Sequence, residues 1–181
     1  SLLVTALCAW FRREGVRVAP FKAQNMSNNA RVVATNHGSG EIGVAQWLQA
    51  RAAGIEPDIR MNPVLLKPEA DTQSQVIVRG QVDRALTDTP WQARHDALWA
   101  PMASAFDELR ADFDLVVIEG PSIGSRFGSA HDRAGPWWLV VDDLKGAFPI
   151  AVVPPTSRAK YATGKGNAKK EAVMAGVAEH F

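Results

Sequence analysis

The stretch DLVVIEGPSIGSRFGSAHDRAG, residues 114–135, places a carboxylate at the end of an apolar run. The run is short and is followed by Gly and Pro, a pattern typical of an interior parallel strand. Glu119 ends this predicted strand, and a loop rich in Gly and Ser follows it. Ligands of open α/β sheets bind outside the carboxyl ends of such strands. Glu119 is therefore a candidate for binding or catalysis, and the alternative is a solvated acid at a strand end.

Other residues have side chains that could take part in chemistry, but their sequence context favours a structural role. The single cysteine, Cys8, lies on the apolar face of a predicted helix and indicates core packing rather than a nucleophile. His37 and Glu41 are four residues apart, but no second metal-spaced His or Cys follows, which favours a polar loop. Trp137 and Trp138 could stack on bases, although their apolar surroundings favour a core position.

The composition is that of a globular protein, and the charge is uneven along the chain. The 181 residues are 46% hydrophobic and 22% charged, with a formal net charge of +1. Residues 145–181 hold six basic and two acidic residues, a balance of +4, which leaves −3 for the remainder. This basic tail predicts either a solvated face or a surface that meets phosphates. We find no signal peptide and no apolar run near the roughly 20 residues of a membrane span, so we expect a cytoplasmic protein.

The elements that must position these residues alternate between helices and strands. Apolar spacing and Gly or Pro stops define each element. Alternation of this kind predicts an α/β fold with layered helices flanking a mainly parallel sheet. The predicted helices are 1–13, 41–54, 91–111, 135–146 and 167–181, and the predicted strands are 16–21, 75–80, 114–119 and 149–155.

Three stretches of the first half carry a family resemblance. They are VAPFKAQNMSNN, GEIGVAQWLQARAAGIEP and MNPVLLKPEADTQSQVIVRG. Together they resemble the synthetase domain of cobyric acid synthases, which are dethiobiotin-synthetase-like P-loop enzymes, over about residues 1–120. The resemblance implies a P-loop NTPase-like fold and the ATP- and glutamine-dependent amidation of side-chain carboxylates of a corrinoid during cobalamin biosynthesis.

The same resemblance implies roles for particular residues. Lys22, Gln24 and Asn25 would face nucleotide or substrate, and Glu41 and Glu119 would be ligands of Mg²⁺. Cations, amide donors and a magnesium ion suit the transfer of phosphate to a carboxylate.

The chain departs from the family pattern at two places. The family has a glycine-rich phosphate loop before the first helix, and Ser1 is in register with the hydroxyl residue that ends this loop. After Glu119 the family leads to a glutaminase domain with a Cys nucleophile, for which Cys8 cannot substitute. We therefore expect weak ATP binding and an inactive fragment.

Residues 114–181 resemble a different family. VVIEGPSIGSRFGSAHDRAGPWWLVV and PIAVVPPTSRAKYATGKGNAKKEAVMAGVAEHF are similar to RuvC-like Holliday junction resolvases of actinobacterial phages. That resemblance implies an RNase H-like fold and cleavage of branched DNA by two metal ions held by four acids. Glu119 matches the second acid, while positions for the other three are absent. The residues implied to approach the DNA backbone are Lys160, Lys165, Lys169 and Lys170.

The two resemblances overlap at the Glu119 strand, which either family would make part of a metal site. The sequence predicts a hybrid, whether a natural recombinant, a mis-joined reading frame or a constructed chimera. By extent of resemblance, an amidotransferase fragment ranks before a junction-nuclease fragment, and a catalytically inert hybrid is the third possibility.

Overall fold

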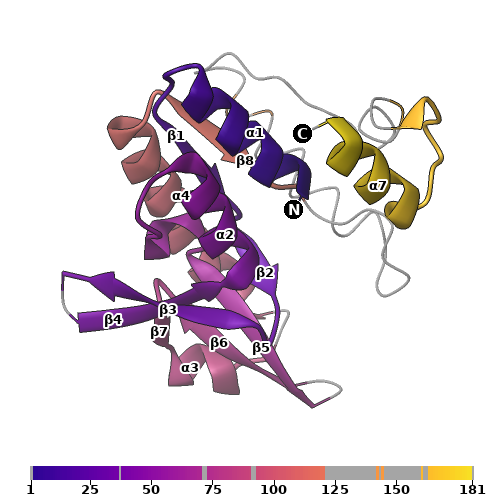
Figure 1. Cartoon of the computed structure of the whole chain (residues 1–181). Coiled ribbons are helices and arrows are strands. Elements are labelled where there is room, and N and C mark those ends of the chain that lie inside the picture. The colour runs from indigo at the N-terminus through magenta and orange to yellow at the C-terminus, as the bar shows by residue number, and fades with distance from the viewer. Residues whose placement is uncertain are drawn as a thin grey trace. The chain divides into compact units, whose positions relative to one another are not determined.

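The computed structural model describes residues 2–36, 38–70, 73–90, 93–120, 142, 144, 160 and 163–180. The chain divides into two compact units, Ser1–Glu119 and Gly120–Phe181. Figure 1 shows the helices and strands of the first unit, whose strands form three sheets. The fold is α/β, with parallel and mixed sheets flanked by helices, as the alternation of elements predicts.

A parallel strand pair organises the first layer. Strand β1 (Val18–Phe21) pairs with β8 (Leu115–Ile118), and Val18 lies opposite Leu115. Helices α1 (Leu2–Arg13) and α2 (Val44–Ala53) pack on each other and on β1. Cys8 is buried in the cluster that α1, α2 and β1 form, and burial raises the pKa of its thiol to about 12. The prediction that Cys8 is a core residue is confirmed.

A mixed four-stranded sheet forms the second layer. Its order is β2-β5-β6-β7, in which β2 and β5 are parallel and the other two pairs are antiparallel. An antiparallel hairpin, β3 with β4, completes the strands (Figure 1). The bounds are β2 Gln24–Met26, β3 Ala30–Thr35, β4 Gly38–Gly43, β5 Val64–Ala70, β6 Gln73–Val78 and β7 Gln81–Val82.

Of the remaining helices of this unit, α4 connects the β1–β8 pair with the mixed sheet. The 3-10 helix η1 (Ile59–Met61) precedes β5, and the short helix α3 (Arg84–Asp88) follows β7. Helix α4 (His95–Asp112) leads into β8 and packs Leu98 against the mixed sheet. At its other end Leu109 packs in a cluster with Phe21 of β1, so α4 joins the two layers.

Most predicted elements of this unit are confirmed, with one correction. The helix predicted for 41–54 begins at Val44, because Glu41–Gly43 pair with Ala30–Val32 as the end of β4. It ends as predicted, at Gly54, whose φ of 73° is left-handed. The strands and α-helices of this unit that were not predicted are β2, β3, β4, β5, β7 and α3.

In the second unit the described residues include helix α7 (Lys170–His180), inside the helix predicted for 167–181. The helix predicted for 135–146, the strand predicted for 149–155 and the tryptophans at 137 and 138 fall almost entirely outside the described residues. No helix in the described ranges is long and apolar enough to cross a membrane.

Candidate functional site

The carboxyl ends of β1 and β8 bring a lysine and a glutamate together. Lys22 follows β1 and Glu119 follows β8, so the parallel register that pairs Phe21 with Ile118 places them side by side. Lys22 Nζ lies 3.1 Å from Glu119 Oε1. The two side chains are 22% and 14% exposed. Residues 97 positions apart therefore form a partly buried ion pair at the edge where parallel sheets bind ligands.

Helix α2 supplies a second partner for the same carboxylate. Gln49 is fully buried, and its Nε2 donates to Glu119 Oε2 at 2.9 Å. Burial raises the pKa of Glu119, but attraction by Lys22 and the hydrogen bond from Gln49 outweigh it, so the pKa lies below its ordinary value. Glu119 is therefore held as a carboxylate.

A network of side-chain amides lies beside this pair. Asn25 Nδ2 donates to Gln46 Oε1 at 3.1 Å. Asn62 accepts from the backbone N–H of Gly43 at 3.0 Å and donates to the carbonyl of Lys22 at 3.2 Å. These contacts join the end of β1 to the start of α2. A Cβ on Gly43 would come within 2.5 Å of Asn25 Nδ2 and 2.8 Å of Gln46 Oε1, so a side chain there would displace this amide pair.

The structure thus groups Lys22, Asn25 and Glu119 around α2. Gln24 precedes Asn25 in β2, opposite Val64 of β5. The sequence analysis missed three buried contributors: Gln46, Gln49 and Asn62. The first two had a signal, since two glutamines three residues apart in the otherwise mostly apolar run VAQWLQARAA lie on one helix face.

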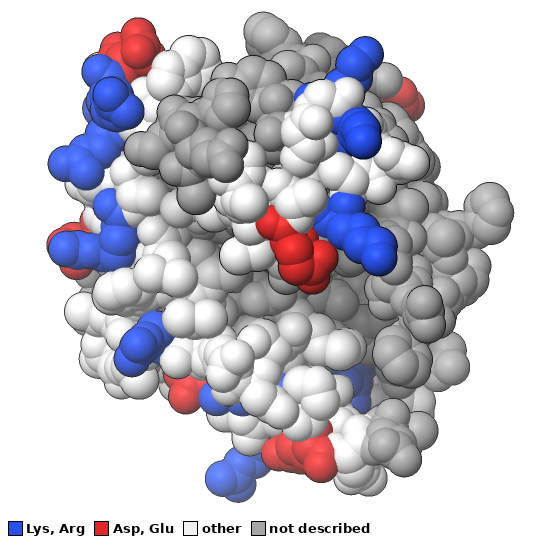
Figure 2. Space-filling view, turned by 45° about the vertical axis from the view of Figure 1, so that its right-hand side comes forward, with Lys and Arg blue, Asp and Glu red and all other residues white. Residues whose placement is uncertain are grey.

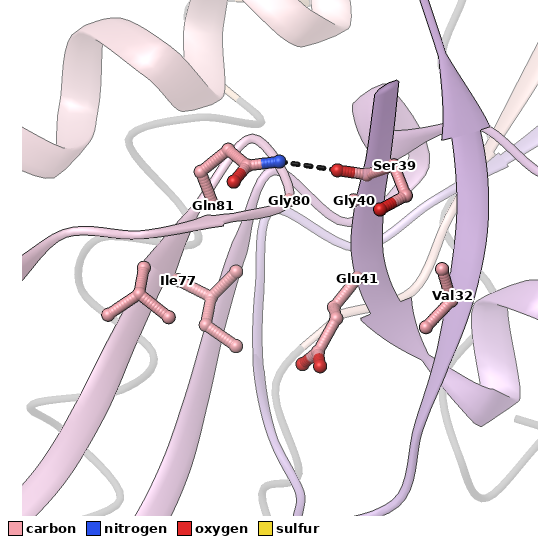
Figure 3. A pocket seen from close by; sticks show the side chains of 8 residues that line it. Val32, Ser39, Gly40, Glu41, Ile77, Gly80 and Gln81 are labelled. Carbon is pink, nitrogen blue, oxygen red and sulfur yellow. Dashed lines mark hydrogen bonds between the residues drawn. The ribbon is translucent and has the colours of Figure 1, made fainter. Parts of the chain in front are cut away.

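Glu41 lies at a second location, between two hairpins. Its carboxylate pairs with Lys67 of β5. It lines a cavity of about 220 Å³ together with Val32, Ile77, Gly80 and Gln81. Figure 3 shows the Glu41 side chain pointing into the space between Ile77 and Val32. The backbone N–H of Glu41 donates to the carbonyl of Gly80 at 3.0 Å, which ties the hairpins together.

As arranged, these carboxylates do not fit a shared magnesium ion. Glu119 is engaged at both oxygens by Lys22 and Gln49, and Glu41 pairs with Lys67. Magnesium is held by one or two carboxylates that face the metal rather than a lysine. No group of three or more His, Cys, Asp or Glu within the described ranges could hold a metal ion. The metal role of Glu41 and Glu119 stays a prediction from the resemblance.

The remaining predicted site residues are not brought to this edge by any described contact. Ser1 and His37 lie outside the described residues. Lys160, Lys165 and Lys169 are exposed in the second unit, and Lys170 begins α7. On the face shown in Figure 2, Lys and Arg lie at several separate places with Asp and Glu among them. A DNA-binding role for the four lysines stays a prediction.

Comparisons with known proteins agree with the first of the two resemblances. The cobyric acid synthase of Albidiferax ferrireducens is 62% identical over 120 residues, which cover 66% of this chain and 24% of that protein. The N-terminal two thirds of the chain are similar to one segment of cobyric acid synthases. The cobyric acid synthase of Paracidovorax citrulli is 64% identical over 160 residues, which cover 82% of this chain and 32% of that protein. The chain thus spans about a quarter to a third of the length of these relatives.

The comparisons give no support to a resolvase-like segment or a hybrid. The first unit, Ser1–Glu119, is about two thirds of the chain, so a match that covers 82% must include residues beyond Glu119. Similarity to a cobyric acid synthase therefore continues past the predicted seam. No protein-family model matches the chain, and no solved structure matches it.

Proposed function

We propose that this chain forms part of the synthetase site of a cobyric-acid-synthase-like enzyme with a P-loop NTPase-like fold, which uses ATP and glutamine to amidate side-chain carboxylates of a corrinoid. The proposal rests on similarity to enzymes of that name over two thirds of the chain or more. The observation that carries it is the Lys22–Glu119 pair at the carboxyl ends of two parallel strands.

The residues at this edge suit the recognition of a carboxylate. Lys22 presents an ammonium with three N–H donors, of which the described contact to Glu119 uses one. Asn25 lies in β2, and its amide is held by Gln46. We propose that Lys22 pairs with the substrate carboxylate or with the phosphate attached to it, and that Gln24 and Asn25 add amide contacts. Glu119 keeps the Lys22 ammonium oriented before the substrate arrives.

Magnesium would neutralise phosphate charge in such a reaction. Because the carboxylates in this arrangement pair with lysines, we assign the metal no step. The junction-nuclease alternative is not proposed as a second function, since no described contact favours it.

The test is equilibrium dialysis of the full chain against two corrinoids, detected by their visible absorbance. One corrinoid carries free side-chain carboxylates, and in the other every such group is an amide. We expect tighter binding of the carboxylate form, and Lys22→Met should weaken it about tenfold, the cost of one charge-assisted hydrogen bond.

Arg17→Met is the matched control, because Arg17 forms an ion pair at the opposite end of the same strands. It should leave corrinoid affinity unchanged. Equal affinity for the two corrinoids, or the same loss in Arg17→Met as in Lys22→Met, would overturn the proposal.

A further inference from the structure

Helix α2 buries two glutamines that a purely structural helix would not need. Gln46 and Gln49 have no exposed surface, and they share the buried face of α2 with Ala50 and Ala53. A buried amide costs free energy unless both its N–H and C=O groups are hydrogen-bonded, whereas an apolar side chain of similar size has no such cost. Within the described part of the chain, Gln46 Nε2 has no hydrogen-bond partner. Stability alone does not explain these residues.

The contacts of the two glutamines separate their roles. Gln49 Nε2 donates to Glu119 Oε2 at 2.9 Å, while Lys22 Nζ lies 3.1 Å from the other oxygen, Oε1. The amide orientation follows from chemistry, because an ionised carboxylate only accepts hydrogen bonds and Gln49 must present its NH₂ group. Gln46 contacts Asn25 instead. One helix thus holds two candidate site residues that come from different strands.

We propose that Gln49 is a positioning residue, which fixes the Glu119 carboxylate so that Oε1 faces Lys22. The terminal torsion of a glutamate is broad, so the carboxylate alone would not keep its plane turned so that an oxygen faces the lysine. With Oε2 held by Gln49, the carboxylate plane is fixed and Lys22 stays at one place on the sheet edge. This inference rests on the proposed function, in which Lys22 is held in place to pair with a substrate carboxylate.

The test measures how fast an amine-acetylating reagent modifies Lys22 in the full chain, with peptide mass spectrometry as the readout. The exposed Lys165 and Lys169 of the same sample serve as internal references. In the parent, Lys22 should react more slowly than both. Gln49→Met keeps the volume and removes the donor, and it should raise the Lys22 rate about threefold to tenfold, as expected for the loss of one hydrogen bond to a charged group.

Gln46→Met is the matched control. It removes the other buried glutamine of α2, which contacts Asn25 and not Glu119 in the described contacts, so the Lys22 rate should stay at the parent value. If the two glutamines only stabilise the helix, both substitutions should change the melting temperature, and the Lys22 rate should be the same in the two variants. If Gln49→Met does not fold, Gln49→Asn tests the same contact, because its amide is one methylene too short to reach Glu119.

An unchanged Lys22 rate in a folded Gln49 variant, or an equal rise in Gln46→Met, would overturn the inference. Lys22 labelling does not depend on corrinoid binding. The positioning role can therefore fail while the carboxylate preference holds, and the preference can fail while the positioning role holds.

Discussion

The two ends of the β1–β8 pair carry the same kind of contact in different surroundings. At the amino end Arg17 Nη2 lies 2.8 Å from Asp114 Oδ1, and at the carboxyl end Lys22 Nζ lies 3.1 Å from Glu119 Oε1. The first pair has side chains 66% and 51% exposed, and the second 22% and 14%. Proximity of opposite charges therefore does not distinguish a candidate site from a surface contact here. The burial of the two side chains distinguishes the carboxyl end from the amino end.

The chemistry of the two cations differs as well. Arg17 directs Nε and Nη2 to Asp114 and Nη1 to the carbonyl of Asp112, so all three guanidinium nitrogens donate to this short segment. Lys22 is a compact ammonium whose donors can turn to a new partner. The amino end is thus an ion pair that links the two strands, whereas at the carboxyl end Lys22 is the residue for which we propose ligand binding.

The largest expected effect is the loss of the cation at the carboxyl end. Lys22→Met leaves the Glu119 carboxylate partly buried without its cationic partner, which should lower the free energy of unfolding by about 2–3 kcal/mol, somewhat less than for a fully buried pair. Urea unfolding at neutral pH measures it. Arg17→Met should shift the urea midpoint less, because water replaces its contacts. An equal or larger shift in Arg17→Met would break the contrast.

An intermediate effect is the loss of stability that we expect when Glu119 is protonated at acid pH. The pKa of Glu119 in the folded chain lies below its ordinary value of 4.5, so the unfolded chain takes up the proton first. Its contribution to stability is complete above the unfolded pKa and is lost as the pH falls through the folded pKa. Glu119→Gln should therefore destabilise the chain by about 1–2 kcal/mol at pH 7, the value of a hydrogen-bonded charge.

The difference between the parent and Glu119→Gln should shrink as the pH falls from about 5 toward the folded pKa of Glu119. Urea midpoints measured at intervals across this range give the comparison. A difference that stays constant with pH would mean that the charge of Glu119 adds nothing to stability.

Part of this fold could be predicted from local sequence, and the rest depends on strand pairing. The strand ending at Glu119 and the helix spanning Leu2–Arg13 follow from apolar periodicity, which is a local property. Strands β3 and β4 were missed because the run GSGEIG has two-residue spacing but few apolar residues, and its strand state depends on pairing with Ala30–Thr35. Strand β5 contains Pro68 and continues into exposed residues, which masks its pattern.

The partners of the two carboxylates also could not be predicted from local sequence. A resemblance suggested that Glu41 and Glu119 share one task, whereas the structure pairs Glu41 with Lys67 and Glu119 with Lys22. Lys22 lies 97 residues before Glu119, and only the parallel register of β1 with β8 makes them neighbours. Gln49 lies 70 residues before Glu119 and reaches its carboxylate from helix α2.

The smallest expected effect is a difference in salt dependence between the ion pairs at the two ends of the β1–β8 pair. The hydrogen bond from Arg17 holds the pKa of Asp114 below its ordinary value, but both side chains are exposed, so ions screen their attraction. Asp114→Asn should lower the urea midpoint slightly at low salt, and the difference should disappear in about 1 M NaCl, where the screening length is roughly 3 Å. The midpoint difference caused by Glu119→Gln should persist at that salt concentration, because the protein shields its pair from ions. If salt abolished both differences equally, the carboxyl end would be as solvated as the amino end, and the burial that supports a binding role for Lys22 would not hold in solution.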